Sequence, residues 1–376
     1  MRLLAADRAI LDRLLPGLDA ALGRHPLTEL ERPESPGLAA FRLARGPGLL
    51  VPVEHGGTGA TAREAVRCTR AIGSRSPSLA VAATMHNFSV ASLVALSSRS
   101  EGFEWMLLDA VARDRLLVAS AFAEGRTAQG ILSPTMRAER DGKRWLVTGS
   151  KKPCSLSRSA DIFTTSVLLH EDAEAPRLGV ALITAHSPGI TVRPFWASGV
   201  LTGAESDELV LTEVPVEDEL MVRMAVDPDA PPDDDLQTVG LIWFSLLITA
   251  AYLGAAAGLV ERLTATRGTP ELRAQIVTDL VGAALAVDRV AADVDAGDTG
   301  QDVLADALVA RYAAQGAIGR AVSQTVELLG GIAFVSGPDV AYLAAACQAL
   351  AFHPPSRGSV GRSLDGYFAG GTLTVD

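Results

Sequence analysis

The feature that most constrains the fold is an uncharged stretch, Leu236 to Val260, in a chain of 376 residues. A helix of about 20 apolar residues is long enough to cross a membrane. This stretch is interrupted by polar residues such as Gln237, Ser245 and Thr249, and an acidic segment, not a basic one, precedes it. Membrane helices are flanked by basic residues on the cytoplasmic side. We therefore expect no membrane span here and predict the central helix of a large bundle, buried on all sides.

The composition indicates a globular cytoplasmic protein. Hydrophobic residues make up 48% of the chain and charged residues 20%, which excludes disorder. The formal net charge of −11 argues against a nucleic-acid partner, because phosphates require a basic surface. Cys68, Cys154 and Cys347 show no CxxC spacing and no nearby histidine cluster. We interpret them as reduced thiols and expect no metal site.

The chain divides into three blocks with different periodicities. Residues 1–116 predict helices, with helical spacing over 5–22, 63–72, 76–97 and 102–117. Residues 117–225 change to short strands and turns, and residues 236–376 are again helical and rich in Ala, Leu and Val. The strand–helix alternation of a doubly wound sheet is missing. The predicted fold class is therefore mainly α with a central β domain.

A polar stretch in the β block, Gly149 to Ser157, contains two lysines, a proline, a cysteine and three serines. Predicted strands flank it at 143–148 and 160–169. A loop of this composition would offer hydroxyl and backbone donors to a flat polar ligand. It would serve equally well as a plain surface connection, and the stretch alone does not decide between the two.

Taken with the order of the blocks, four local matches resemble the acyl-CoA dehydrogenase family over essentially the whole chain. They are an entry motif at Leu49 to Gly59, the Gly149 to Ser155 segment, the strand from Gly203 to Leu220, and Thr325 to Gly331 followed by Pro338. The resemblance implies an N-terminal helical domain, a middle β-barrel and a C-terminal four-helix bundle. It also implies a homo-oligomer, either a dimer or a tetramer.

The same resemblance implies a non-covalently bound FAD between the β domain and the bundle. Ser155 keeps a hydroxyl that lies near the flavin's reactive edge in the family, whereas Pro153 replaces a tryptophan that packs beside the ring. The other flavin-contacting positions carried over are Phe122, Ala123, Glu124, Thr127, Cys154, Arg267, Glu327, Gly330 and Gly331. Glu124 has a structural alternative, pairing with a neighbouring cation, and Cys154 has one as a buried thiol.

The position of the family's catalytic base is the largest departure. In most relatives a glutamate stands where this chain has His353, and the second location used by some relatives holds Phe244 and Ser245. Dehydrogenation of an acyl thioester needs a base at the α-carbon while a hydride goes to the flavin. A histidine with its ordinary pKa of about 6.5 would serve as that base at neutral pH. The alternative for His353 is a turn residue beside two prolines.

A second resemblance, to flavin monooxygenases built on the same fold, covers the same positions. Those enzymes, such as dibenzothiophene monooxygenase and sugar nitrososynthases, carry a His-x-Pro segment like His353 to Pro355, a serine like Ser155 and, in some, a helix histidine like His86. These three are the implied catalytic set, in which polar groups assist oxygen chemistry at the flavin. His86 has the alternative of a packed helix histidine.

Three hypotheses follow from these resemblances. The first is an FAD enzyme that oxidises an acyl thioester, bound to CoA or to a carrier protein, and passes electrons to an acceptor. The second is an oxygenase that uses FMN or another reduced flavin supplied by a separate reductase. The third is a non-catalytic relative that has lost the flavin.

Overall fold

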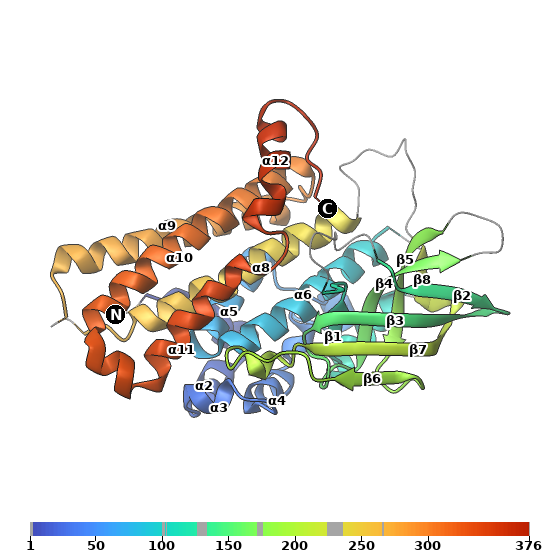
Figure 1. Cartoon of the computed structure of the whole chain (residues 1–376), viewed down its shortest axis with the longest axis horizontal. Helices are drawn as coiled ribbons and strands as arrows, with labels where there is room; N and C mark the ends of the chain where they lie inside the picture. The colour runs from blue at the N-terminus through green and yellow to red at the C-terminus, as the bar shows by residue number, and fades with distance from the viewer. Residues whose placement is uncertain are drawn as a thin grey trace.

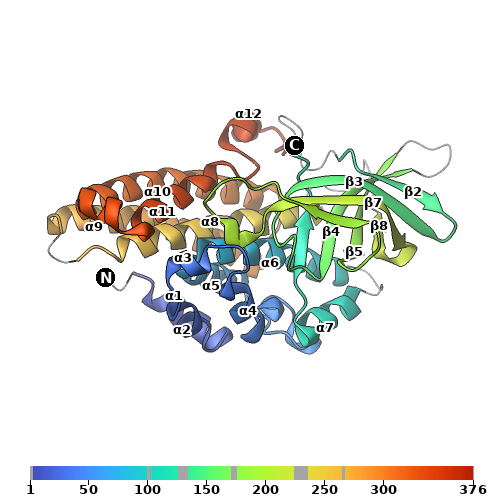
Figure 2. The ribbon, with the colours of Figure 1, turned by 60° about the horizontal axis from the view of Figure 1, so that its bottom comes forward.

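The computed structural model describes residues 3–99, 102, 104–125, 134–170, 176–223, 236–264 and 267–375. A layer of helices comes first, a β-sheet second and a bundle of long helices last (Figure 1). The sheet lies at one end of the molecule, and the long helices extend away from it (Figures 1 and 2). The predicted fold class is confirmed. The boundary predicted between 225 and 236 falls largely outside the described residues, so the domain limits stay a prediction.

Two helices of the first block pack into the centre of the molecule. α5 (Ala62–Arg75) begins with a capping box, in which Thr61 and Glu64 each accept a backbone N–H from the other. α6 (Pro77–Ser97) follows at once, capped by the hydroxyl of Ser76. The surrounding elements are α1 (Ala5–Leu14), α2 (Leu18–Gly23), α3 (Leu27–Leu30), α4 (Pro36–Leu43), η1 (Gly46–Gly48), η2 (Val53–His55) and α7 (Glu104–Asp114).

The prediction of one helix over 5–22 was wrong, since two helices occupy this range. Pro16 has no backbone N–H to continue the first helix, and Gly17 has a φ of 81°, in the left-handed region that favours glycine. The helices predicted at 63–72, 76–97 and 102–117 are found within a few residues of those limits.

The described part of the second block forms one eight-stranded sheet with the order β6-β7-β3-β2-β4-β5-β8, and β1 pairs in parallel with β4. Most neighbouring strands are antiparallel. The strands are β1 (Val118–Ala121), β2 (Arg137–Asp141), β3 (Arg144–Cys154), β4 (Ile162–His170), β5 (Arg177–Thr184), β6 (Ile190–Arg193), β7 (Asp207–Glu217) and β8 (Met221–Arg223), with η3 (Thr202–Ala204) and η4 (Asp218–Leu220) between them.

The polar stretch from 149 to 157 is mostly strand, which corrects the prediction of a loop. β3 continues to Cys154, because Gly149 to Lys151 pair with β7. The pairing slips between Lys151 and Cys154, so that the residues between them form a bulge. Sequence reasoning missed the strand because Lys151 looks solvated, yet it is fully buried.

The third block is built around α8 (Leu236–Val260), the uncharged stretch. α8 packs against α5 and α6 and against the other long helices of its own block. At its crossing with α5, a Cβ on Gly73 would lie 2.3 Å from the Ala251 carbonyl oxygen, so only glycine allows the helices to approach this closely. The remaining elements are α9 (Pro270–Asp295), α10 (Gln301–Ser336), α11 (Pro338–Ala346), η6 (Cys347–Ala351) and α12 (Arg357–Phe368).

Two described helices, α6 and α8, are long and apolar enough to cross a membrane. In the most apolar stretch of each, 67% and 83% of the residues are buried inside the protein. Their apolar character is therefore explained by packing in the protein core, as predicted for α8.

Candidate functional site

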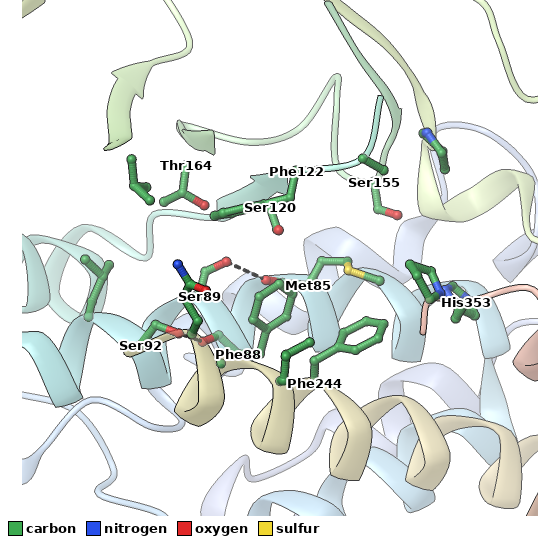
Figure 3. Close-up of a pocket in the computed structure, with 18 of the residues that line it drawn as sticks. Met85, Phe88, Ser89, Ser92, Ser120, Phe122, Ser155, Thr164, Phe244 and His353 are labelled. Carbon is green, nitrogen blue, oxygen red and sulfur yellow. Dashed lines mark hydrogen bonds between the residues drawn. The ribbon is translucent and has the colours of Figure 1, made fainter. Parts of the chain in front are cut away.

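A cavity of about 230 Å³ lies between the sheet and the helices α6 and α8 (Figure 3). Its walls are mainly apolar, and several serines, Thr164, Gln237 and one histidine supply polar groups. None of the described lining residues is an acid, a lysine or an arginine. Its lining includes Met85, Phe88, Ser155, Trp196, Phe244 and His353.

The sheet contributes side chains of β4, β5 and β8 to the cavity, together with the ends of two strands, β1 and β3. Phe122 and Ala123 follow β1, and Pro153 lies in the bulge of β3. The Ser155 hydroxyl is 3.0 Å from that of Ser206, and both residues are buried at the cavity wall. The predicted positions Phe122, Ala123 and Ser155 therefore converge on one cavity, although they come from separate strands.

A buried ion pair holds these two strand ends together. The Lys151 ammonium donates to the Glu124 carboxylate at 2.9 Å, to the Phe122 carbonyl at 3.3 Å and to the Ser166 hydroxyl at 3.0 Å. Burial acts to raise the pKa of Glu124, but hydrogen bonds from Thr135 and Lys151 outweigh it and lower the pKa to about 2. Glu124 does not line the cavity, and its contacts favour the structural alternative.

The three cysteines are free and buried. Cys154 lies next to the cavity in sequence but does not line it, and burial raises its pKa to about 12. Its thiol is therefore protonated and unreactive at neutral pH. Within the described ranges, no three metal-binding side chains come together.

His353 lies at one end of the cavity, beyond the last turn of η6 (Figure 3). Its Nε2 is 2.8 Å from the Tyr252 hydroxyl, and its ring packs edge-on near Phe244. The buried guanidinium of Arg311 donates to the carbonyls of His353 and Pro354. Burial of the ring, and then the positive charge of Arg311, lower the pKa of His353 to about 3. The expectation of a base with an ordinary pKa was therefore wrong, since a ring whose pKa is about 3 accepts a proton only weakly.

His86 lies on α6 and is fully buried. Its Nε2 is 2.9 Å from the Pro47 carbonyl oxygen, and its Nδ1 accepts the Val118 N–H at 2.9 Å. Burial is the main cause that lowers its pKa to about 4. Both ring nitrogens are thus occupied by backbone groups and the side chain does not line the cavity, which favours the alternative of a packed histidine.

The other predicted flavin contacts lie elsewhere. Arg267 precedes α9, and Glu327, Gly330 and Gly331 belong to the last turns of α10, at the end of the bundle opposite the sheet (Figure 1). Gly330 kinks α10 with a φ of 82°, and the Arg267 guanidinium lies 3.9 Å from where its Cβ would be. None of the four lines the cavity. Thr127 lies outside the described residues.

Several cavity residues were missed by sequence reasoning. Phe88 and Phe244 meet edge to face, with ring centroids 5.4 Å apart, and join α6 to α8. Trp196 supplies an aromatic ring to the same lining as Pro153, where the sequence predicted that an aromatic ring had been lost. Tyr252 and Arg311 hold His353. Apolar residues on buried helices carry no local signal of a site, so only the packing identifies them.

Comparisons with known proteins give the chain its family. The chain is 48% identical, over its whole length and that of the relative, to isobutylamine N-hydroxylase of Streptomyces viridifaciens. It is 24% identical to a putative acyl-CoA dehydrogenase of Bacillus subtilis, over 63% of this chain and 58% of that protein. The structure of KijD3 in complex with FMN and a dTDP-sugar matches 97% of this chain and 94% of KijD3, at 20% identity and a TM-score of 0.84. No protein-family model matches the chain.

The chain belongs to the acyl-CoA dehydrogenase-like family of flavoenzymes. This confirms both resemblances, to the family and to its monooxygenases. Within the family it is a flavin-dependent oxidoreductase, and the comparisons support the hypothesis of oxygenation better than that of acyl thioester dehydrogenation.

The residues around the cavity fit the ring system of a flavin. Aromatic and aliphatic walls suit a flat ring, and the hydroxyls of Ser155 and Ser206 offer hydrogen bonds at its edge. The enclosed volume is below that of pockets which enclose whole drug-sized ligands, roughly 300 Å³ and above. It is therefore the size of a ring or a small substrate.

Proposed function

We propose that this protein is a flavin-dependent monooxygenase that hydroxylates the nitrogen of a small aliphatic primary amine. The observation that carries the proposal is the 48% identity to isobutylamine N-hydroxylase over the full length of both chains. The reduced flavin would come from a separate reductase, as in the oxygenase hypothesis. FMN is the favoured flavin, because KijD3 binds FMN.

The character of the cavity supports an uncharged amine as the substrate. Burying an ammonium ion without a counter-charge costs several kcal/mol or more. The described lining offers no carboxylate, and its apolar side chains suit a short branched alkyl group. The neutral amine also has the nitrogen lone pair that an oxygen transfer requires. We infer that the cavity binds the free base.

The chain's own residues have three roles in this proposal. Phe88, Phe244 and Trp196 exclude water, and Ser155 with Ser206 orients the ring of the cofactor. His353 places a polar group at the end of the cavity. The bound flavin would supply the activation of O₂ and the transfer of one oxygen atom.

The dehydrogenase hypothesis lacks a base in the described cavity. An acyl thioester loses its α-proton to a carboxylate in most of the family, and His353, with a pKa of about 3, is a weak substitute. The proposal keeps the remaining expectations of a cytoplasmic enzyme and a homo-oligomer, in which the Arg267 end of the bundle would meet a second copy.

The proposal is tested by supplying the purified protein with FMN, NADH, an NADH-dependent flavin reductase, ¹⁸O₂ and isobutylamine. We expect the hydroxylamine to carry one ¹⁸O atom, since amine, O₂ and reduced FMN give hydroxylamine, water and oxidised FMN. The matched control is anaerobic protein with FAD and a short acyl-CoA, for which we expect no bleaching of the flavin. If the flavin bleached in that control and no ¹⁸O-labelled hydroxylamine formed from isobutylamine, the proposal would be overturned in favour of dehydrogenation.

A further inference from the structure

The hydrogen bond between Tyr252 and His353 determines where the imidazole carries its proton. Tyr252 is fully buried on α8, and its hydroxyl has one hydrogen-bond partner among the described residues, Nε2 of His353 at 2.8 Å. If Nε2 donated this bond, the tyrosine proton would be buried with no acceptor. Buried hydroxyl donors are almost always satisfied. Tyr252 is therefore the donor, and Nε2 of His353 is the acceptor.

The second nitrogen of His353 is free of protein partners in the part of the chain that the structure describes. Nδ1 forms no hydrogen bond there and is also absent from the buried polar atoms that lack a partner, so it is accessible. His86 provides a contrast, since backbone groups occupy both of its nitrogens. Of the two histidines predicted to act in catalysis, only His353 has a nitrogen left for a ligand.

We infer that Tyr252 is a positioning residue that fixes the neutral Nδ1–H tautomer of His353, so that this histidine offers the cavity a hydrogen-bond donor and no base. The role in the reaction rests on the proposed function, whereas the tautomer does not. A fixed N–H donor at this place would bind the oxygen-bearing edge of the cofactor or the oxygen that is being transferred.

The groups around the ring support this assignment. The ring meets Tyr252 and Phe244 of α8, and the charge of Arg311 on α10 acts on it. The groups whose charges act on the Tyr252 hydroxyl are Cys347, Glu31, Tyr342 and Arg311. No described carboxylate forms a hydrogen bond or an ion pair with the imidazole. Arg311 is 1% exposed, and its guanidinium donates to the backbone carbonyls of His353 and Pro354. A positive charge on the ring would therefore meet repulsion from Arg311, whereas in the neutral Nδ1–H form the Tyr252 hydroxyl and Nε2 satisfy each other and Nδ1–H is left for a ligand.

The tautomer is tested directly by ¹⁵N NMR of histidine-labelled protein without flavin or amine. The chain has six histidines, so the His353 signal is assigned by its loss in His353→Asn. We expect a neutral ring protonated at Nδ1 at pH 7, and a mixture of tautomers in Tyr252→Phe. Tyr312→Phe is the matched control, because its hydroxyl bonds the Pro355 carbonyl of the same segment without touching the ring. Protonation at Nε2, or an unchanged signal in Tyr252→Phe, would overturn the inference.

The donor role is tested by two amides that place their nitrogen differently. In His353→Asn the amide N–H takes the place of Nδ1–H, whereas in His353→Gln it falls near Nε2. We expect His353→Asn to keep kcat within roughly tenfold, and His353→Gln to lose about 100-fold. Tyr252→Phe should lower kcat by roughly tenfold with little change in KM, the effect of about one hydrogen bond. Equal loss of kcat in both amide variants would overturn the donor role. If NMR still showed the Nδ1–H tautomer in the unmodified protein, this result would refute the role in the reaction and leave the tautomer assignment intact.

Discussion

The two ends of the long-helix bundle differ in how much of a binding site a single chain provides. At the sheet end, Phe122, Ser155 and His353 come from three separate segments and enclose one cavity. At the opposite end, Arg267 and Gly330 are neighbours, yet the surface around them is open. The family resemblance assigns both groups to one flavin site, with His353 as a catalytic residue and the others as cofactor contacts.

The difference teaches that a motif match locates residues without showing whether one chain completes their site. Next to the motif of the far end, Ile332 is 83% exposed and Val335 is 84% exposed. Large apolar side chains exposed together mark an interaction surface. The cavity end is closed by this chain's own helices, whereas in the homo-oligomer that we propose a second copy would cover the far end.

The largest expected effect separates the two ends by activity. His353→Ala should reduce hydroxylation by at least 100-fold at saturating FMN, because it removes the polar group at the end of the cavity. Arg267→Ala should leave the rate at saturating FMN nearly unchanged and weaken only flavin binding or assembly. Steady-state rates, with sedimentation to measure assembly, check both. An equal loss of rate in the two variants would break the comparison.

The next effect concerns the uncharged lining of the cavity. An alkylamine with a pKa of about 10.4, as in lysine, is almost entirely protonated at pH 7. If only the free base enters, kcat/KM should rise about tenfold per pH unit between pH 7 and 9. A fluorinated amine of lower pKa is the control, and its profile should level off at lower pH. A flat profile for the ordinary amine would mean that the ammonium form is bound.

A smaller effect is expected on stability at the cavity end. The pKa values of His353 and His86 are about 3 and 4 in the folded state, against about 6.5 when unfolded. Below pH 6.5 the unfolded chain therefore takes up protons that the folded chain does not. The free energy of unfolding should fall with decreasing pH, by up to about 1.4 kcal/mol per pH unit for each histidine. Urea unfolding between pH 7 and 5 measures the slope.

The control for this slope is His353→Asn, which should remove about one proton from the pH dependence while His86 continues to contribute. Because the pKa of Glu124 is near 2, its carboxylate loses its charge only at much lower pH. A slope in His353→Asn equal to that of the unmodified protein would show that the ring of His353 is not buried as described.

The smallest effect compares one hydroxyl with one exposed acid. Ser155→Ala removes the hydrogen bond to Ser206 and should lower the free energy of unfolding by about 1 kcal/mol. Glu327→Ala, on the exposed far end, should change it by less than about 0.5 kcal/mol. Thermal unfolding of the two variants checks the pair, and a larger loss in Glu327→Ala would contradict the view that this end is open in the single chain.

Much of the fold followed from local pattern. The uncharged run from Leu236 to Val260 became the buried α8 with those limits, because a helix without a polar face must be covered on all sides. The pattern failed at residues 149–157, where a buried lysine pairs with Glu124, 27 residues earlier in the chain. A charge that is neutralised by a distant partner cannot be told from a solvated one by its neighbours in sequence.

For the site, the sequence by itself determined the family resemblance. Because Ser155 and His353 both belong to motifs of that resemblance, it also implied that they converge on one flavin site. Only the tertiary structure decided the state of His353. The pKa of a histidine depends on burial and on nearby charges, and Tyr252 and Arg311 stand 101 and 42 residues away from it in the chain. The family resemblance therefore implied a base at this position, and the fold surrounds the ring with groups that make it a weak proton acceptor.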